Sequence, residues 1–505
     1  MDAALYADEL WQRPEITRLV DKYAFYFRPK NNPDGSELYL NTAQTLRSTV
    51  RPYDSDGDGL LDEDPANDIN GDGYILQVRI KVPKGQGTMV IDPRDPKGRL
   101  MMRAQAGEGI YQVVSEGLDD DGDGRIDEDG IGGLDLHRNY PENWRPMPGR
   151  DQTGRGYTQG GAGDYPLSEP ETRWLVVFLL EHPNIGVANS MDTSVPMHLR
   201  PPSTSPSKER MFPEDLSYYI YFDTTGKKIS GYARAGDVFS DYGGGSPLFG
   251  HGPDFGYWYY GAIWYGDELW NGGRVEDQNN DRVVDELDRF IFCDRNLTIP
   301  SFKPWTPGKH PIYGDVEFGG WSGKFWSQNP PPEILEEWAK KEAMFNLMLA
   351  KHMPDVVIGE PKITKGDSGK FTIAIDIENK GYLPTALQQA QLVKIVRQDM
   401  VYLDFPAGML GVGGGGRGDA GGAGGGGRGG GMPPVQQRAQ QPQQAARVQM
   451  VEPRQPSVNI DRLQGGEKKT VTFTVKLNEI SSVEATIRFS STRGGVLRKK
   501  ITIGG

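Results

Sequence analysis

Cysteine is scarce in this chain of 505 residues, and membrane-spanning hydrophobic runs and a signal-like start are lacking. Cys293 is the only cysteine, which excludes an intrachain disulfide and a thiolate zinc site. No window is long and apolar enough to cross a bilayer, so we expect no membrane span. The residues after Met1 lack the basic stretch and apolar core of a secretory signal peptide.

Basic charge is also scarce relative to acidic charge, and the net charge is −13. The excess is local: residues 54–72 carry eight carboxylates and residues 119–129 carry seven, while the rest of the chain is roughly balanced. This distribution indicates local cation sites, not a global field. It does not favour nucleic acid as a partner, because a phosphate backbone is bound by clustered lysine and arginine.

The first 353 residues show alternating helix and strand signals, which predict an α/β domain over residues 1–353. The expected elements are a helix over 5–19, a buried strand over 23–27, a turn at 32–35, a helix opened by a capping box at 168–171, a strand over 185–188 and a helix over 333–351.

After Pro354 the pattern changes to strict alternation of apolar and polar residues. Residues 371–377, 471–477 and 483–489 all have this period of two, which predicts a small antiparallel, Ig-like β-sandwich over 354–505. Residues 407–456 are rich in Gly, then Gln and Pro, and cannot bury enough apolar surface to order themselves. We expect them to form a disordered loop within the sandwich.

Three Asp-rich loops, at 54–73, 119–129 and 277–288, place Asp or Asn at alternate positions, and the first two have glycine between them. Calcium needs six to eight oxygen ligands, and alternate Asp or Asn side chains can wrap it while glycine permits the sharp turn. The alternative is a solvated acidic turn. The candidate calcium ligands are Asp54, Asp56, Asp58, Asp62, Asp68, Asn70, Asp72, Asp119, Asp121, Asp123, Asp127 and Asp129, with a weaker set of Asp277, Asn279, Asp281 and Asp285 in the loop where Arg282 replaces glycine.

One string carries the most information: Gly132-Gly-Leu-Asp-Leu-His-Arg-Asn-Tyr-Pro141, with Trp144 behind it. It resembles the Asp-x-Asn-Arg-Asn-Phe-Pro signature of the zinc carboxypeptidases, and the likeness covers roughly residues 4–353. Further matching strings follow in family order at 32–35, 165–171, 261–270 and 310–320. The acidic loops inserted before Leu134 are similar to those of a bacterial branch of the family.

The resemblance implies a mixed, twisted eight-stranded sheet with helices on both faces, and hydrolysis of the last peptide bond of a substrate. In the family an Asn-Arg pair binds the substrate carboxylate; here Arg138 keeps the arginine and His137 replaces the asparagine. Glu268 takes the position of the general base that acts on zinc-bound water, or is simply a carboxylate at a strand end. Arg47 or Arg51 would stabilise the oxyanion.

The zinc site, however, is incomplete in this sequence. The family binds zinc with a His-x-x-Glu pair and one later histidine, and no His-x-x-Glu occurs in this chain. By family order the pair would fall immediately upstream of Met1, so we interpret the chain as truncated at its start. The later ligand position holds Asp192, which can bind zinc through oxygen. The offset of the nearby His198 favours a structural role instead.

Three functions follow as hypotheses. The first is a zinc carboxypeptidase acting on peptide or protein C-termini. The second is a calcium-stabilised pseudoenzyme that keeps the peptide cleft and binds chain ends or cell-surface material; the changes at His137 and Asp192 favour it. The third is a structural or adhesive calcium protein, which would not explain Arg138 and Glu268. As it stands, the chain is expected to be inactive. Because such loops need millimolar calcium, we expect an extracytoplasmic location.

Overall fold

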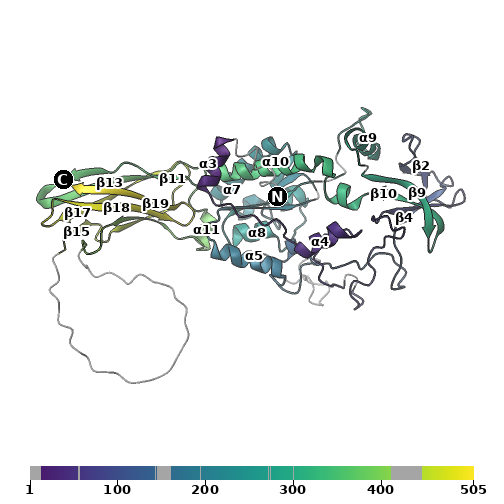
Figure 1. Ribbon diagram of the computed structural model, residues 1–505, viewed down its shortest axis with the longest axis horizontal. Coiled ribbons are helices and arrows are strands. Elements are labelled where there is room, and N and C mark those ends of the chain that lie inside the picture. The colour runs from purple at the N-terminus through teal and green to yellow at the C-terminus, as the bar shows by residue number, and fades with distance from the viewer. Residues whose placement is uncertain are drawn as a thin grey trace, which may run out of the picture. The chain divides into compact units, whose positions relative to one another are not determined.

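The computed structural model describes residues 13–54, 57–142, 144, 161–193, 195–270, 272, 275–299, 301–410 and 446–505. The chain divides into two compact units (Figure 1). Unit 1 comprises Met1–Lys351 and Leu387–Ile395, and unit 2 comprises His352–Ala386 and Val396–Gly505. Within the described ranges, no helix has the length and hydropathy that crossing a membrane requires.

Unit 1 contains two sheets and the helices around them. Its strands are β1 (Gln77–Lys81), β2 (Met89–Ile91), β3 (Met101–Arg103), β4 (Tyr111–Ser115), β5 (Val187–Asp192), β6 (Met197–Arg200), β7 (Arg234–Asp237), β8 (Ile263–Glu268), β9 (Phe302–His310) and β10 (Gly314–Trp321). Its helices and short helical turns are α3 (Pro14–Lys22), α4 (Pro33–Asn41), η1 (Leu136–Arg138), α5 (Pro170–Glu181), α6 (Ser207–Arg210), α7 (Pro213–Ser230), η2 (Val238–Tyr242), α8 (Gly252–Trp258), α9 (Glu286–Asn296), η3 (Gly323–Gln328), α10 (Pro332–Lys351) and α11 (Gln388–Leu392).

The sheet that carries the candidate site has the order β5-β8-β6-β7. It is mixed, because β5 pairs with β8 and β6 with β7 in parallel, whereas β6 and β8 are antiparallel. Four strands form it among the described residues, where we expected eight. One expected strand, residues 23–27, runs extended but joins no sheet.

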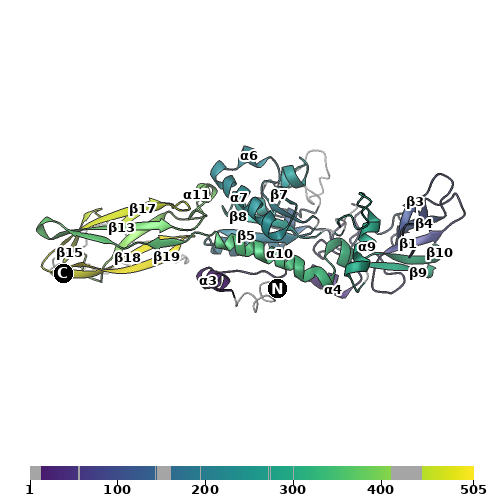
Figure 2. The same cartoon turned by 90° about the horizontal axis from the view of Figure 1, so that it is seen from above.

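Helices cover both faces of this sheet. Trp264 packs with Tyr140 and Phe255 on the side of α5 and α8. Tyr265 points to the other side, where it meets Tyr219 of α7 and Phe345 of α10. Successive side chains of a strand alternate between faces, so consecutive residues of β8 serve two different cores. Figure 2 shows α10 lying along β5 and beside α7.

The second sheet of unit 1 is entirely antiparallel, in the order β3-β2-β4-β1-β10-β9. It joins segments far apart in sequence, since Val78 of β1 lies opposite Phe318 of β10. Figure 1 shows this as blue strands beside green ones. Val78, Ile80, Val316 and Phe318 form its buried apolar cluster.

Two local predictions were wrong for identifiable reasons. The expected turn at 32–35 is instead the start of α4: the Asn32 side chain accepts a hydrogen bond from the Gly35 amide, and Pro33 occupies the first helical position. The expected capping box at Ser168 is absent, because α5 begins after Glu169 without a side-chain cap. The Ser168 hydroxyl donates to Glu169 instead. The predicted helix over 333–351 is confirmed by α10. The strand predicted over 185–188 exists but lies further along the chain, because β5 begins at Val187 and continues to Asp192.

Unit 2 consists of two antiparallel sheets. One has the order β11-β13-β17-β15 with β12 added to β13, and the other has the order β16-β14-β18-β19. The strands are β11 (Val356–Ile358), β12 (Lys362–Lys365), β13 (Lys370–Asn379), β14 (Asp399–Asp404), β15 (Val448–Glu452), β16 (Ser457–Asp461), β17 (Lys468–Leu477), β18 (Ser482–Ser491) and β19 (Gly495–Gly504), with a short turn η4 (Asp367–Gly369).

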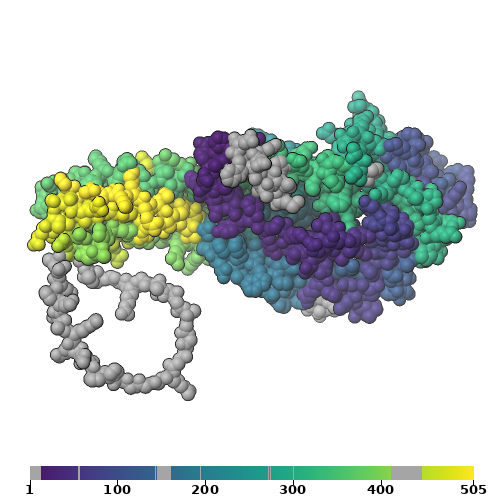
Figure 3. Space-filling view, viewed as in Figure 1, coloured from purple at the N-terminus to yellow at the C-terminus, as the bar shows by residue number. Residues whose placement is uncertain are grey.

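The two sheets share one apolar core, to which β13 contributes Ile375 and β18 contributes Ile487, both fully buried. Burial alternates along β13, β17 and β18, which confirms the predicted strands. Figure 3 shows early strands in green and late strands in yellow on the surface of this unit. The predicted loop 407–456 was drawn too long, because β15 lies inside that range and pairs with β17; residues 411–445 lie outside the described residues.

Candidate functional site

Two carboxylates end neighbouring parallel strands. Asp192 is the last residue of β5 and Glu268 the last of β8, and the two are directly paired in the sheet. Side groups at the carboxyl ends of parallel strands converge at one edge of the sheet, the usual place for a ligand site in an α/β fold. The sheet therefore brings together two residues that lie far apart in the sequence.

His137 lies against this pair. The turn η1 that carries it is capped by Asp135, whose carboxylate accepts the backbone N–H of His137 at 2.9 Å. The imidazole Nδ1 lies 3.0 Å from Oδ2 of Asp192. The other oxygen, Oδ1, accepts the backbone N–H of Thr193 at 2.8 Å. Both oxygens of Asp192 therefore have partners within the protein.

Burial acts against charge on both members of this pair, but their mutual hydrogen bond outweighs it. The net effect raises the pKa of His137 and lowers the pKa of Asp192. The pair is thus an imidazolium facing a carboxylate over a wide pH range. Burial, followed by the nearby charge of Asp192, raises the pKa of Glu268 to about 7. Its Oε2 atom has no hydrogen-bond partner among the described residues.

The two candidate oxyanion arginines are separated by the structure. Arg47 lies at the site: its Nη2 is 3.0 Å from Asp135, and the charges of Asp135 and Asp192 contribute to its raised pKa. Two-thirds of the Arg47 side chain is exposed, so its guanidinium is accessible to a ligand. Arg51 instead pairs with Asp164 at 2.9 Å and Glu169 at 2.8 Å.

Arg138 is nearly buried beside His137, and its guanidinium donates to the His137 carbonyl at 3.4 Å. A second histidine, His251, stands edge-on to the His137 ring with centroids 5.4 Å apart, and burial lowers its pKa. Tyr242 also reaches the site, where it hydrogen-bonds Glu268. Sequence reasoning missed His251 and Tyr242, since neither lies in a string that resembles the family.

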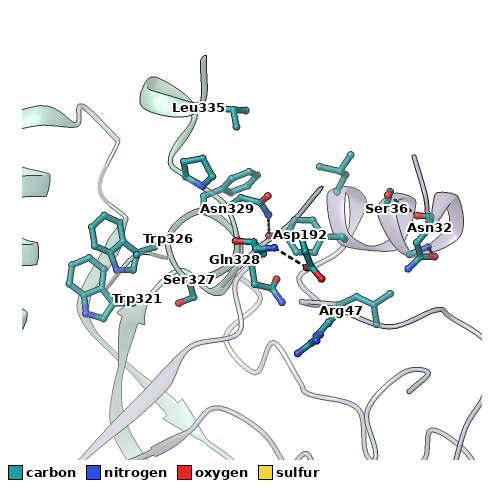
Figure 4. Close-up of a pocket in the computed structure, with 18 of the residues that line it drawn as sticks. Asn32, Ser36, Arg47, Asp192, Trp321, Trp326, Ser327, Gln328, Asn329 and Leu335 are labelled. Atoms are coloured by element: carbon teal, nitrogen blue, oxygen red, sulfur yellow. Dashed lines mark hydrogen bonds between the residues drawn. The ribbon is translucent and has the colours of Figure 1, made fainter. Parts of the chain in front are cut away.

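A pocket of about 830 Å³ opens beside Asp192 and Arg47 (Figure 4). Its walls combine polar groups from α4 with aromatic rings and amides from the segment around η3. Tyr39 is held by hydrogen bonds with the Lys324 carbonyl and the Asn329 amide. The residues that give the pocket its chemistry are Asn32, Tyr39, Arg47, Asp192, Arg289, Trp321, Phe325, Trp326, Gln328 and Asn329.

The described residues at this site do not fit a zinc ion. All six histidines of the sequence are described, and only His137 reaches Asp192, with its nitrogen already paired to the carboxylate. Zinc needs at least three protein ligands. No group of three closely spaced donors in the described part of the chain includes Asp192.

The first two acidic loops lie side by side. Asp64, within the first loop, accepts backbone N–H groups of Asp120 and Asp127 from the second. Three groups of carboxylates have oxygens within 4.8 Å of one another: Asp58, Glu63 and Asp121; Asp64, Asp121 and Glu128; and Asp119, Asp121 and Asp123. Of the other candidate ligands, Asp62 and Asp129 adjoin these groups, Asp54 and Asp127 belong to the same two loops, and Asp56 lies outside the described residues.

Glu63 and Glu128 were missed, although the same Asp-Glu-Asp string stands at 62–64 and at 127–129. Burial of their carboxyl groups raises the pKa of each to about 7. Later in the first loop, Asp68, Asn70 and Asp72 each accept a backbone N–H group from Asp72 or Tyr74. In the third, Asp285 caps α9 and pairs with Arg94 at 2.8 Å, while Asp277, Asn279 and Asp281 bond the loop backbone.

Comparison with known proteins adds three findings. Residues 3–234 match the family model of zinc carboxypeptidases, and residues 355–502 match a domain of unknown function, DUF8731. None of the curated proteins compared with the sequence matches it. Among solved structures, thrombin activatable fibrinolysis inhibitor aligns with 20% identity and a TM-score of 0.23, over 28% of this chain and 34% of that one.

Two glycosidases also align. β-Glucosidase 3B from Thermotoga neapolitana has 13% identity and a TM-score of 0.14, over 30% of this chain and 16% of its own. DesR, a β-glucosidase from Streptomyces venezuelae, has 9% identity and a TM-score of 0.13, over 30% and 15%. This chain therefore spans about a third or less of each of these structures.

Proposed function

Because residues 3–234 belong to the zinc carboxypeptidase family, we propose that the pocket beside Asp192 binds the free C-terminal end of a peptide without hydrolysing it. One observation carries the proposal. The position that would hold the later zinc ligand is occupied by a carboxylate already paired with His137 at 3.0 Å. An imidazolium at that place competes directly with a metal ion for the Asp192 oxygen.

Two arginines support recognition of a carboxylate. Arg47 and Arg289 both line the pocket, and Nε of Arg289 has no hydrogen-bond partner among the described residues. A guanidinium can donate two parallel charge-assisted bonds to a carboxylate. The stacked rings of Trp321 and Trp326, 4.7 Å apart, offer an apolar wall for the last side chain of the peptide.

Isothermal titration calorimetry with a peptide ending in a free carboxylate, compared with the same peptide ending in an amide, tests this function. We expect binding of the free acid only, and at least tenfold weaker binding for Arg47→Ala, the loss of about one charge-assisted bond. Arg51→Ala is the matched control, because Arg51 pairs with Asp164 and Glu169. Equal affinity for acid and amide would rule the proposal out.

Hydrolysis of C-terminal peptide bonds is the second candidate function. It is favoured by Glu268, whose burial beside Asp192 raises its pKa to about 7, the range suited to a general base near neutral pH. Against it, no group of three closely spaced donors in the described residues includes Asp192. Zinc-dependent release of C-terminal residues by this polypeptide would establish this function in place of the first.

The paired acidic loops, in our proposal, bind calcium. Support comes from the converging carboxylates of Asp121 and its neighbours, which repel one another unless a cation or protons lie between them. Such loops suit a millimolar calcium concentration, so we propose an extracytoplasmic location. We also propose that residues 1–353 form a carboxypeptidase-like domain and that residues 354–505 form an Ig-like β-sandwich domain, apart from residues 387–395, which belong to unit 1.

A further inference from the structure

A second cluster of metal-ligating side chains lies in unit 1, away from the pocket. It consists of His198 from β6, Asp267 from β8 and Glu342 from α10, all fully buried. One donor atom from each lies within 4.8 Å of the others. Of the closely spaced donor groups in the described ranges, this is the one that includes a histidine and excludes solvent.

The cluster is separated from Glu268 by the sheet itself. Asp267 and Glu268 are consecutive in β8, so their side chains point to opposite faces. Glu268 faces Asp192, while Asp267 faces α7 and α10. The sequence position of His198 suggested a structural role. In the structure its ring lies on the side of the sheet covered by α7 and α10, away from Asp192.

The hydrogen bonds around His198 allow either ring nitrogen to carry the proton. Burial lowers the pKa of His198, which favours the neutral ring. Nε2 lies 2.9 Å from the Ser230 hydroxyl oxygen. When that hydroxyl donates to the Gly226 carbonyl, 3.0 Å away, Nε2 donates to the hydroxyl and Nδ1 presents a lone pair. This lone pair faces Oδ2 of Asp267 at 2.9 Å.

More acceptors converge on the same place. Oδ1 of Asp267 has no hydrogen-bond partner in the described part of the chain, and the Glu342 carboxylate faces Asp267 and the Tyr232 hydroxyl. Buried carboxylate oxygens without partners are costly, since each loses its hydration without compensation. A single positive ion between the three side chains would satisfy all of these atoms at once.

The geometry points to a buried binding site for a divalent transition-metal ion, held by Nδ1 of His198 and the carboxylates of Asp267 and Glu342. Two carboxylates and one divalent ion sum to zero charge, as a dry interior requires. One imidazole with two carboxylates suits zinc, which takes nitrogen and oxygen ligands at low coordination number. The bond from Nε2 to Ser230 is the outer-shell contact that orients a metal-binding histidine.

The surrounding rings hold His198 in place for this role. Its imidazole stacks on Phe345 with centroids 3.8 Å apart and lies 4.9 Å from the ring of Tyr232. The ligands come from two strands and the helix α10, so a bound ion would link the sheet to the helix that covers it. We therefore assign the site a structural role, independent of peptide binding.

The competing explanation is proton sharing, in which Glu342 is protonated and donates to Asp267. Burial raises the pKa of both groups, that of Asp267 to about 7. Glu342→Gln separates the two explanations. An amide can still donate to Asp267, as a protonated carboxyl would, but it removes one negative charge and one metal ligand.

The test is the metal content of the whole chain, expressed with added zinc, exchanged into chelator to clear exposed loops and measured by mass spectrometry. We expect about one zinc per chain in the wild type and in His137→Gln, and at least a tenfold loss in Glu342→Gln. Retention in Glu342→Gln, loss in His137→Gln or absence from the wild type would each overturn the assignment. If Glu342→Gln fails to fold, Asp267→Asn replaces it. Absence of zinc from the wild type overturns the assignment whatever the variants show.

Discussion

Nδ1 of His137 lies 3.0 Å from Oδ2 of Asp192, and this contact joins the short helical turn η1 to the end of β5, an edge strand of its sheet. The sequence resemblance predicted a substrate-binding role for His137 and a zinc-ligand position for Asp192. In the structure the two side chains instead form an ion pair, which gives each of them a partner within the protein.

Replacing Asp192 with asparagine is expected to lower the pKa of His137. The raised pKa depends on the carboxylate, and once it is removed burial alone favours the neutral ring. Histidine NMR titration of wild type and Asp192→Asn measures this directly, with the other five histidines as internal controls. An unchanged His137 titration would show that the two side chains do not interact in solution.

Stability should vary with pH through the same pair. The raised pKa of His137 adds stability below about pH 6.5, which is lost as the pH rises through the native value. The lowered pKa of Asp192 adds stability above about pH 4, which is lost as the pH falls through its native value. The contribution, about 1–2 kcal/mol, is therefore greatest between about pH 4 and 6.5. Urea unfolding across this range should show it in the wild type and not in His137→Gln.

Carboxypeptidase activity is expected to be absent from this chain. The candidate general base Glu268 is present, but no group of three donors in the described residues includes Asp192. Incubation with zinc and a peptide, followed by mass spectrometry of the products, should show no loss of C-terminal residues above the level of Glu268→Gln. Release that disappears in Glu268→Gln would contradict this expectation.

Removing calcium should lower the melting temperature. If the converging carboxylates of the paired loops hold a cation, chelation leaves them to repel one another, and we expect a fall of about 5–10 °C. Asp121→Asn should abolish the effect, because Asp121 belongs to all three close groups. Asp281→Asn, in the degenerate loop, is the matched control. A melting temperature that does not respond to chelation would exclude stabilising calcium.

Truncating the core of unit 2 should be costly. Ile375 is fully buried between the two sheets, so Ile375→Ala should reduce the free energy of unfolding by about 2–5 kcal/mol. Val496→Ala is the control, because half of that side chain is exposed. Chemical denaturation of both variants measures the difference. A loss below about 1 kcal/mol for Ile375→Ala would mean that the two sheets do not pack closely in solution.

Sequence patterns predicted the elements whose burial is regular. The alternation in β13, β17 and β18 and the long α10 were readable because one face of each is consistently apolar. The sequence did not predict local structure that depends on a single side chain. Asn32 fits both a turn and a helix cap, and the hydrogen bond to Gly35 decides between them only in three dimensions.

Long-range pairing was also beyond sequence reasoning. The six-stranded sheet joins β1 to β10, and no local pattern specifies a partner so distant. The same holds for the sites. Asp192 and Glu268 could be placed by family order, whereas His251 and Glu342 reach their positions through the packing of α8 and α10. No neighbouring residue in the sequence indicates that His251 or Glu342 would lie at a site.

The helix α11 has a consequence for how this chain can be divided. It lies between segments of unit 2 but belongs to unit 1, where the amides of Gln388 and Gln389 donate to the buried carboxylate of Asp215. A gene fragment that stops at Lys351 would therefore leave Asp215 without these donors. The two units cannot be exchanged as separate modules by recombination at a single junction, so they are expected to be inherited together.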